Sequence, residues 1–123
     1  MKQTVKWLST PESHDYQAAE DYLSLVMSAD KAAEYRQKLS DAKDDVTHRK
    51  AKDILRASQL RLLGQDNKYV ASDLSKAASG TPLSPILLIR GNSKHPLLVA
   101  DGYHRVCASY WIDEDTDIPC ILI

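Results

Sequence analysis

The sequence predicts one domain of the α/β class, with a mixed α+β sheet built by its C-terminal half and helices added by its N-terminal half. Two apolar runs of strand length, 86–89 and 118–123, show no alternation, which is typical of strands buried on both faces. A third run, 97–100, leads directly into a helical pattern. The chain has 123 residues, of which 43% are hydrophobic, so it has the size of a single domain with its own core.

The N-terminal segment, residues 1–45, is predicted to be a helical extension packed on the core. A clean amphipathic stripe predicts a first helix over 14–27, with Ser13 or Asp15 as its N-cap. A second helix is predicted from Ser28 or Asp30 to about Ala42, and its thin apolar face places it on the surface.

The core is predicted to span residues 46–123. Residues 46–48 form a brief strand or an extended loop, 51–59 a short helix, and 66–78 a helix capped by Asp66 and ended by Gly80. The polar turn 91–96 makes an antiparallel hairpin of 86–89 and 97–100. A helix over 102–112 then leads to the strand 118–123, and this strand–helix–strand order predicts a right-handed crossover and a parallel pair.

Composition excludes several classes of function. Sixteen basic and seventeen acidic residues give a formal net charge of −1, which argues against binding that relies on covering nucleic-acid phosphates. Cys107 and Cys120 have no partner at metal-ligand spacing, so we expect buried free thiols in a reducing compartment. No signal-like region and no run of roughly 20 apolar residues occurs, so we expect a cytoplasmic protein with no membrane partner.

The stretch Asp101–Arg105 breaks a local rule. His104 and Arg105 stand in the first turn of the predicted helix, where the helix dipole disfavours cations, so we expect them to hold an anion beside Gly102. Asp101 is predicted either to bind Mg²⁺ or act as a general base, or to be only the N-cap of the helix. The alternative for Arg105 is a side chain folded over Asp101 or onto the acidic loop 113–117.

Three segments carry a resemblance to a known family. Leu-Ser-Pro-Ile-Leu-Leu-Ile-Arg (83–90), Leu-Val-Ala-Asp-Gly-Tyr-His-Arg (98–105) and Ile-Pro-Cys-Ile-Leu-Ile (118–123) resemble, in this order, the core of the ParB/sulfiredoxin-like superfamily. The match covers roughly residues 46–123 and is most similar to the small stand-alone ParB-like proteins. In that superfamily a Gly-x-x-Arg turn contacts the phosphates of CTP or ATP, which implies this role for Gly102, His104 and Arg105.

The sequence differs from the family pattern at positions that decide which of the family's activities can be expected. Tyr103 stands where sulfiredoxins carry their catalytic cysteine, so we do not expect sulfinic-acid reduction. The chain ends at Ile123, without the DNA-binding region that follows this core in partition proteins, so we do not expect partition by this chain alone. Asp101 occupies the place of the aspartate that serves chemistry in the free-serine kinases.

A second cationic group lies in residues 48–61. In the resembling families the first core strand and the following helix border the nucleotide, which implies that Lys50, Lys52 and Arg56 reach its phosphates. The alternative is a solvated helix face. Tyr103 is the one aromatic residue considered for stacking on a base, whereas the spacing of the others places most of them in the core: Trp7, Tyr16, Tyr22, Tyr35, Tyr69, Tyr110 and Trp111.

The sequence thus predicts a small nucleotide-binding protein that uses ATP or CTP with Mg²⁺. Phosphoryl transfer to a small-molecule substrate is the activity implied, with Asp101 and His104 as catalytic residues and Asp101 as the metal ligand. The alternative is a non-catalytic ParB-like module that binds DNA or a protein through the 48–61 segment, with a nucleotide as a switch. A third interpretation is an interaction protein without a ligand.

Overall fold

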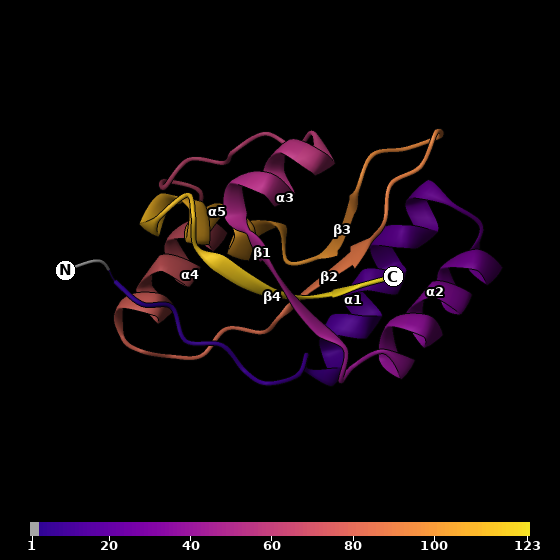
Figure 1. Cartoon of the computed structure of the whole chain (residues 1–123), viewed down its shortest axis with the longest axis horizontal. Helices are drawn as coiled ribbons and strands as arrows, with labels where there is room; N and C mark the ends of the chain where they lie inside the picture. Colours follow the sequence, from indigo (N-terminus) through magenta and orange to yellow (C-terminus); the bar gives the residue numbers. More distant parts are fainter. Residues whose placement is uncertain (1–2) are drawn as a thin grey trace.

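A computed structural model describes residues 3–123 of the chain. Five helices and four strands follow one another as α1 (Ser13–Val26), α2 (Ala29–Asp41), β1 (Val46–Lys50), α3 (Ala51–Ser58), α4 (Lys68–Ala78), β2 (Ile86–Ile89), β3 (Leu98–Asp101), α5 (Tyr103–Ile112) and β4 (Asp117–Leu122). The strands form one mixed sheet in the order β1-β4-β2-β3 (Figure 1). The α/β class with a mixed sheet is therefore confirmed.

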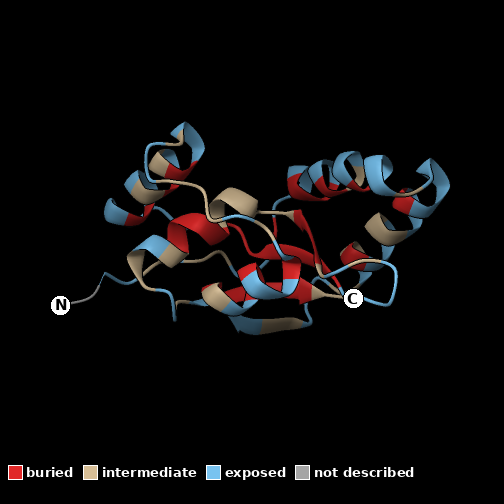
Figure 2. Ribbon diagram, turned by 90° about the horizontal axis from the view of Figure 1, so that it is seen from above, coloured by how far each residue is buried: buried red, intermediate tan, exposed pale blue. Residues whose placement is uncertain are grey.

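The sheet is the middle of three layers. Ile86 and Leu88 of β2 face a core shared with α3, α4 and α5, while Leu87 and Ile89 face a second core shared with α1 and α2. Figure 2 shows the buried residues gathered along the sheet and on the helix surfaces that face it. Burial on both faces explains why the run 86–89 does not alternate, as the sequence predicted.

The pairing of the last strand differs from the prediction. β2 and β3 form the expected antiparallel hairpin, but β4 is not beside β3. Instead β4 lies between β1, to which it is antiparallel, and β2, to which it is parallel. The physical reason is burial: Ile118 to Ile121 are all buried and need a central position, whereas β3 ends at the partly exposed Asp101 on the sheet edge.

Two helix N-caps also differ from the prediction. The cap of α1 is Glu12, and Asp15 is its third residue, whose carboxylate accepts a hydrogen bond from the Glu12 amide at 2.9 Å. The cap of α4 is Asn67 rather than Asp66, because its side chain accepts from the amides of the first turn. Ser28 caps α2, one of the two predicted alternatives.

Burial confirms some expectations and corrects others. Both cysteines are buried free thiols, and burial raises the pKa of Cys120 to about 12. Three aromatic side chains expected in the core are exposed: Tyr22, Tyr69 and Trp111. Within residues 3–123, no helix combines the length and the hydrophobicity needed to cross a bilayer.

Candidate functional site

The turn between β3 and α5 depends on a glycine. Gly102 is the N-cap of α5 and has φ 110°, a conformation that side chains rarely adopt. A Cβ at this position would collide with the side chain of Ile86 and meet the Arg105 guanidinium at 3.0 Å. The turn therefore lies directly against β2, and only glycine allows this approach.

Arg105 is turned back over the end of β3. Its Nη2 lies 2.8 Å from Oδ2 of Asp101, and the two side chains are only 17% and 15% exposed. The same Nη2 donates to the carbonyl oxygen of Pro85 at 3.4 Å, while the buried Nε has no hydrogen-bond partner among the described residues. This arrangement is the alternative that the sequence offered for Arg105, and it fixes the guanidinium at the cavity described below.

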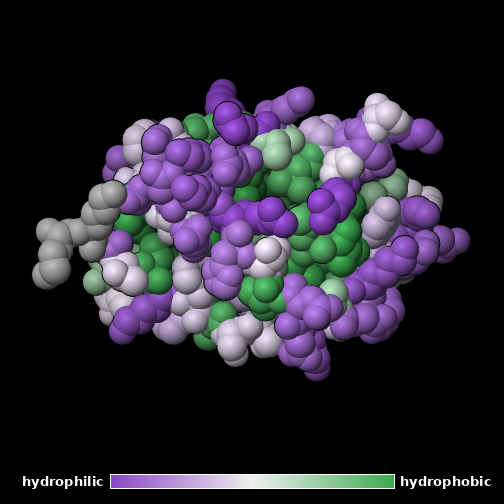
Figure 3. All heavy atoms as spheres, in the orientation of Figure 1, coloured by the Kyte–Doolittle hydropathy of each residue, from purple (hydrophilic) through white to green (hydrophobic). Residues whose placement is uncertain are grey.

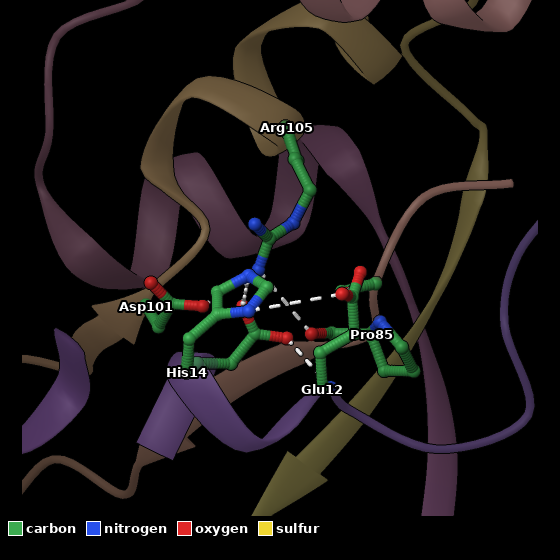
Figure 4. A network of polar contacts seen from close by, with 7 residues as sticks. Glu12, His14, Pro85, Asp101 and Arg105 are labelled. Carbon is green, nitrogen blue, oxygen red and sulfur yellow. Dashed lines mark hydrogen bonds and ion pairs between the residues drawn. The ribbon is translucent and has the colours of Figure 1, made fainter. Parts of the chain in front are cut away.

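The start of α1 approaches the same ion pair (Figure 4). Asp15 is buried, and His14 Nε2 lies 3.4 Å from its Oδ1. Glu12 accepts a hydrogen bond at 3.1 Å from the hydroxyl of Ser84, a residue that lies just before β2. Burial raises the pKa of the Asp101 carboxyl; Arg105 acts against this shift, and the neighbouring Asp15 carboxyl adds to it.

A polar cavity of about 190 Å³ opens between α4 and the start of α5. Its walls are Tyr69, Ser72, Asp73 and Lys76 from α4, and Asp101, Gly102, His104 and Arg105 from the turn and α5. The sequence-predicted residues Asp101, Gly102, His104 and Arg105 are therefore brought together. We refer to this hollow as the α4–α5 cavity.

Charges of both signs meet in the α4–α5 cavity. Asp73 is buried, which raises its pKa, while Arg105, Lys76 and His104 act in the opposite direction. The first amides of a helix have no helical partner, and no described side chain caps those of α5, so they favour an anion. The cavity therefore offers two cationic side chains, an imidazole and a helix N-terminus, partly balanced by two carboxyl groups.

The cations of the 48–61 segment lie elsewhere. Lys52 Nζ is 2.7 Å and Lys50 Nζ 3.7 Å from Oδ1 of Asp115, and Arg56 is 3.4 Å from Asp53. A hydrogen bond to Asp115 raises the pKa of Lys52, and the same bond lowers the pKa of Asp115. None of the three cations lines the α4–α5 cavity, so the structure separates them from the residues of the turn.

The aromatic residue at the cavity is Tyr69 rather than Tyr103. The Tyr103 hydroxyl donates to the carbonyl oxygen of Arg61, and its ring does not line the cavity. The Tyr69 side chain is 54% exposed, and its ring centroid lies 5.0 Å from that of His104. Tyr69 is therefore the ring available to a ligand at the cavity mouth.

Sequence reasoning missed the contribution of α4. Tyr69, Ser72, Asp73 and Lys76 follow one another at intervals of three, one and three, which places them on one face of a helix. That polar face lies beside the apolar stripe of Val70 and Ala77. The spacing was a usable signal, but only the packing of α4 against α5 shows that the face points at the turn.

The donor set fits an anion better than a cation. Within the described part of the chain no three His, Cys, Asp or Glu side chains cluster as metal ligands. Asp101 already lies in contact with Arg105, whose positive charge opposes a second cation at the same carboxylate. The residues present therefore suit a phosphate group and do not suit Mg²⁺ held by Asp101.

The chain matches no family model, no curated protein and no solved structure.

Proposed function

We propose that the chain binds a nucleotide through one of its phosphate groups, which occupies the α4–α5 cavity. The observation that carries the proposal is the convergence of Lys76, His104 and Arg105 with the uncapped N-terminus of α5 on a single hollow. These are the groups that hold phosphate in proteins, by charge-assisted hydrogen bonds and by backbone amides. The resemblance to the ParB/sulfiredoxin-like superfamily suggests ATP or CTP as the ligand.

The size of the cavity suggests how a nucleotide lies. A volume of about 190 Å³ is below the roughly 300–1,000 Å³ of pockets that enclose a drug-sized ligand. The phosphate therefore enters the hollow, and the ribose and base remain outside it. Tyr69 is 54% exposed and offers a ring for the base there, beside the Lys68 ammonium at 4.9 Å and the His104 ring at 5.0 Å.

Asp101 serves as a positioning residue in this proposal. The bonds to Asp101 and Pro85 both use Nη2 of Arg105, so Nη1 has donors left for a phosphate oxygen. Asp101 holds the guanidinium in place, and Lys76 and His104 bind the anion from the other side. Because Asp101 does not suit Mg²⁺, the proposal covers nucleotide binding and includes no step of phosphoryl transfer.

DNA binding through the 48–61 segment is not proposed. Lys50, Lys52 and Arg56 already lie beside Asp115 or Asp53, and the formal net charge of the chain is −1, so the segment does not offer the continuous run of free cations that a backbone of phosphates needs.

Calorimetry with ATP, CTP, GTP and ADP, with and without Mg²⁺, tests the proposal. We expect saturable binding that Lys76→Gln and His104→Gln each weaken about 10-fold, because each loses one charge-assisted hydrogen bond. Neither substitution touches the pair of Arg105 and Asp101. Arg56→Gln removes an exposed cation outside the cavity and is the matched control.

Two results would overturn the proposal. One is the absence of binding by all four nucleotides; the other is a loss in Arg56→Gln equal to the loss in Lys76→Gln. Product analysis after incubation with ATP and a mixture of metabolites, in the same samples, determines whether binding is accompanied by phosphoryl transfer.

A further inference from the structure

A second cavity, of about 500 Å³, lies between α3 and the connection from β2 to β3. It shares no lining residue with the α4–α5 cavity. Figure 3 shows hydrophobic surface in this region, between α3 and the β2–β3 connection, with hydrophilic residues around it. We call it the α3–loop cavity; its volume lies within the roughly 300–1,000 Å³ typical of small-molecule sites.

The floor of the α3–loop cavity is apolar because α3 covers only part of the sheet. This helix has eight residues and ends where Gln59 turns into a left-handed conformation. Leu88 of β2 and Leu122 of β4 continue the sheet surface beyond it, and Leu97 adds a side chain from the connection. Leu97 and Leu122 remain only partly buried, so they are available to an apolar ligand.

The wall opposite α3 is fixed by hydrogen bonds. The Asn92 side chain accepts from the amides of Lys94 and His95 at 2.7 and 3.2 Å, which holds the connection in a tight turn. The Leu97 amide donates to the carbonyl oxygen of Ala57 at 3.2 Å and joins this wall to α3. At Gly91, a Cβ would lie 2.9 Å from backbone atoms of the returning chain. The cavity is therefore largely preformed.

The rim of the α3–loop cavity carries unbalanced positive charge. Arg49 from β1 and Arg90 after β2 both line it and are exposed, and within residues 3–123 neither guanidinium forms an ion pair or a hydrogen bond. The one carboxylate in the lining, Asp53, lies 3.4 Å from Arg56 outside it. An anion here would meet two free guanidinium groups.

We propose that the α3–loop cavity binds a small amphipathic carboxylate. Its carboxylate group is held by Arg49 and Arg90, and its apolar body lies on the partly exposed Leu97 and Leu122. An apolar floor alone would bind any hydrophobic molecule of suitable size, and two arginines alone would bind any anion. The combination in one preformed hollow selects a ligand that has both parts. This inference uses none of the residues of the proposed nucleotide site.

Octanoate is a suitable probe, with octan-1-ol and octylammonium as probes of the same length and different charge. We expect octanoate to shift the amide resonances of Ala57, Gly91 and Leu97 in ¹H–¹⁵N spectra, and to bind more tightly than either control probe. The double variant Arg49→Ala/Arg90→Ala should weaken octanoate binding about 10-fold or more, because both charge-assisted contacts are lost.

Two further variants complete the test. Lys94→Ala removes a cation from the same connection but not from the lining, and should leave octanoate affinity unchanged. Ala57→Tyr fills the hollow from the exposed side of α3 and should abolish binding while every charge remains. Because Arg49 and Arg90 are exposed, the double variant should stay folded, and its ¹H–¹⁵N spectrum should match that of the wild type away from the two substituted positions.

The proposal is overturned if octylammonium binds as tightly as octanoate, if the double variant binds like the wild type, or if octanoate shifts no resonance. It is also overturned if the shifts fall on α4 and the start of α5. Saturating ATP should not displace octanoate. Failure of octanoate binding leaves the nucleotide proposal intact, and failure of nucleotide binding leaves this one intact.

Discussion

The α4–α5 cavity and the α3–loop cavity differ in how their charges are balanced. In the α4–α5 cavity the Arg105 cation is paired with Asp101, and Asp73 faces the remaining cations. In the α3–loop cavity the one lining carboxylate, Asp53, lies 3.4 Å from Arg56, and neither Arg49 nor Arg90 forms an ion pair within residues 3–123. Arg105, whose position at a helix N-terminus is unusual for a cation, is thus neutralised by Asp101. Arg49 and Arg90, whose positions are not unusual in the sequence, have no ion-pair partner within residues 3–123. Local sequence rules identify an unusual position, but only tertiary contacts show whether its charge is available.

Asp101→Ala should produce the largest change in stability. It leaves the Arg105 guanidinium largely buried without its counter-ion, and breaking such a pair costs about 3 kcal/mol of unfolding free energy. Urea denaturation followed by circular dichroism measures this loss. Arg90→Ala removes an exposed cation that has no ion-pair partner within residues 3–123, and should change stability by less than about 0.5 kcal/mol. Equal losses of unfolding free energy in the two variants would contradict the contrast between a paired arginine in one cavity and an unpaired arginine in the other.

A double variant separates charge burial from packing. Asp101→Leu/Arg105→Leu removes both charges at once, and we expect it to recover part of the stability that Asp101→Ala loses. If the double variant is less stable than Asp101→Ala, the ion pair stabilises the turn directly rather than only neutralising Arg105.

Gly102→Ala should cost about 2 kcal/mol, because it adds backbone strain and a collision with Ile86. Gly80→Ala is the matched control: this glycine also has a positive φ, 76°, but its Cβ would meet only the Lys6 side chain, at 3.6 Å. Strain without a collision should cost about 1 kcal/mol. If thermal unfolding shows equal losses, the close approach of the turn to β2 does not hold the cavity in place.

The sequence was most informative where local pattern decides structure. The apolar run 86–89, the hairpin to β3 and the helix after Gly102 were all predictable. The central place of β4 was not, because it depends on which strand needs burial on both faces. In the site, the turn Asp101–Arg105 was predictable, whereas Asp73 and Lys76 were not, since only helix packing brings α4 to the turn.

The charge balance of the α4–α5 cavity should make anion binding pH-dependent. Burial raises the pKa of both Asp73 and Asp101, so these carboxyl groups take up protons at higher pH than exposed ones. Each proton removes a negative charge facing the anion, so affinity rises as pH falls. We expect sulfate, which remains a dianion over this range, to bind more tightly at acidic pH than at neutral pH.

Two variants test this origin of the pH dependence. Asp73→Asn should raise sulfate affinity at neutral pH and flatten the profile, because one titrating carboxyl group is gone. His104→Gln keeps both carboxyl groups, so the rise in sulfate affinity at acidic pH should remain in this variant. Isothermal titration at several pH values gives both profiles, and an affinity that is independent of pH in the wild type contradicts the expected charge balance.

The smallest effect is expected for Lys52→Gln. Lys52 and Asp115 form an exposed pair at 2.7 Å, and solvent and salt screen such pairs strongly. The change should lower the melting temperature slightly at low salt and not at high salt, and it should leave nucleotide affinity unchanged, whereas Lys76→Gln weakens binding. If Lys52→Gln weakens nucleotide binding as much as Lys76→Gln, the basic segment 48–61 takes part in phosphate binding. The phosphate site would then extend from the α4–α5 cavity to the 48–61 segment, which includes Arg49 of the α3–loop cavity. The two cavities could then no longer be treated as separate sites.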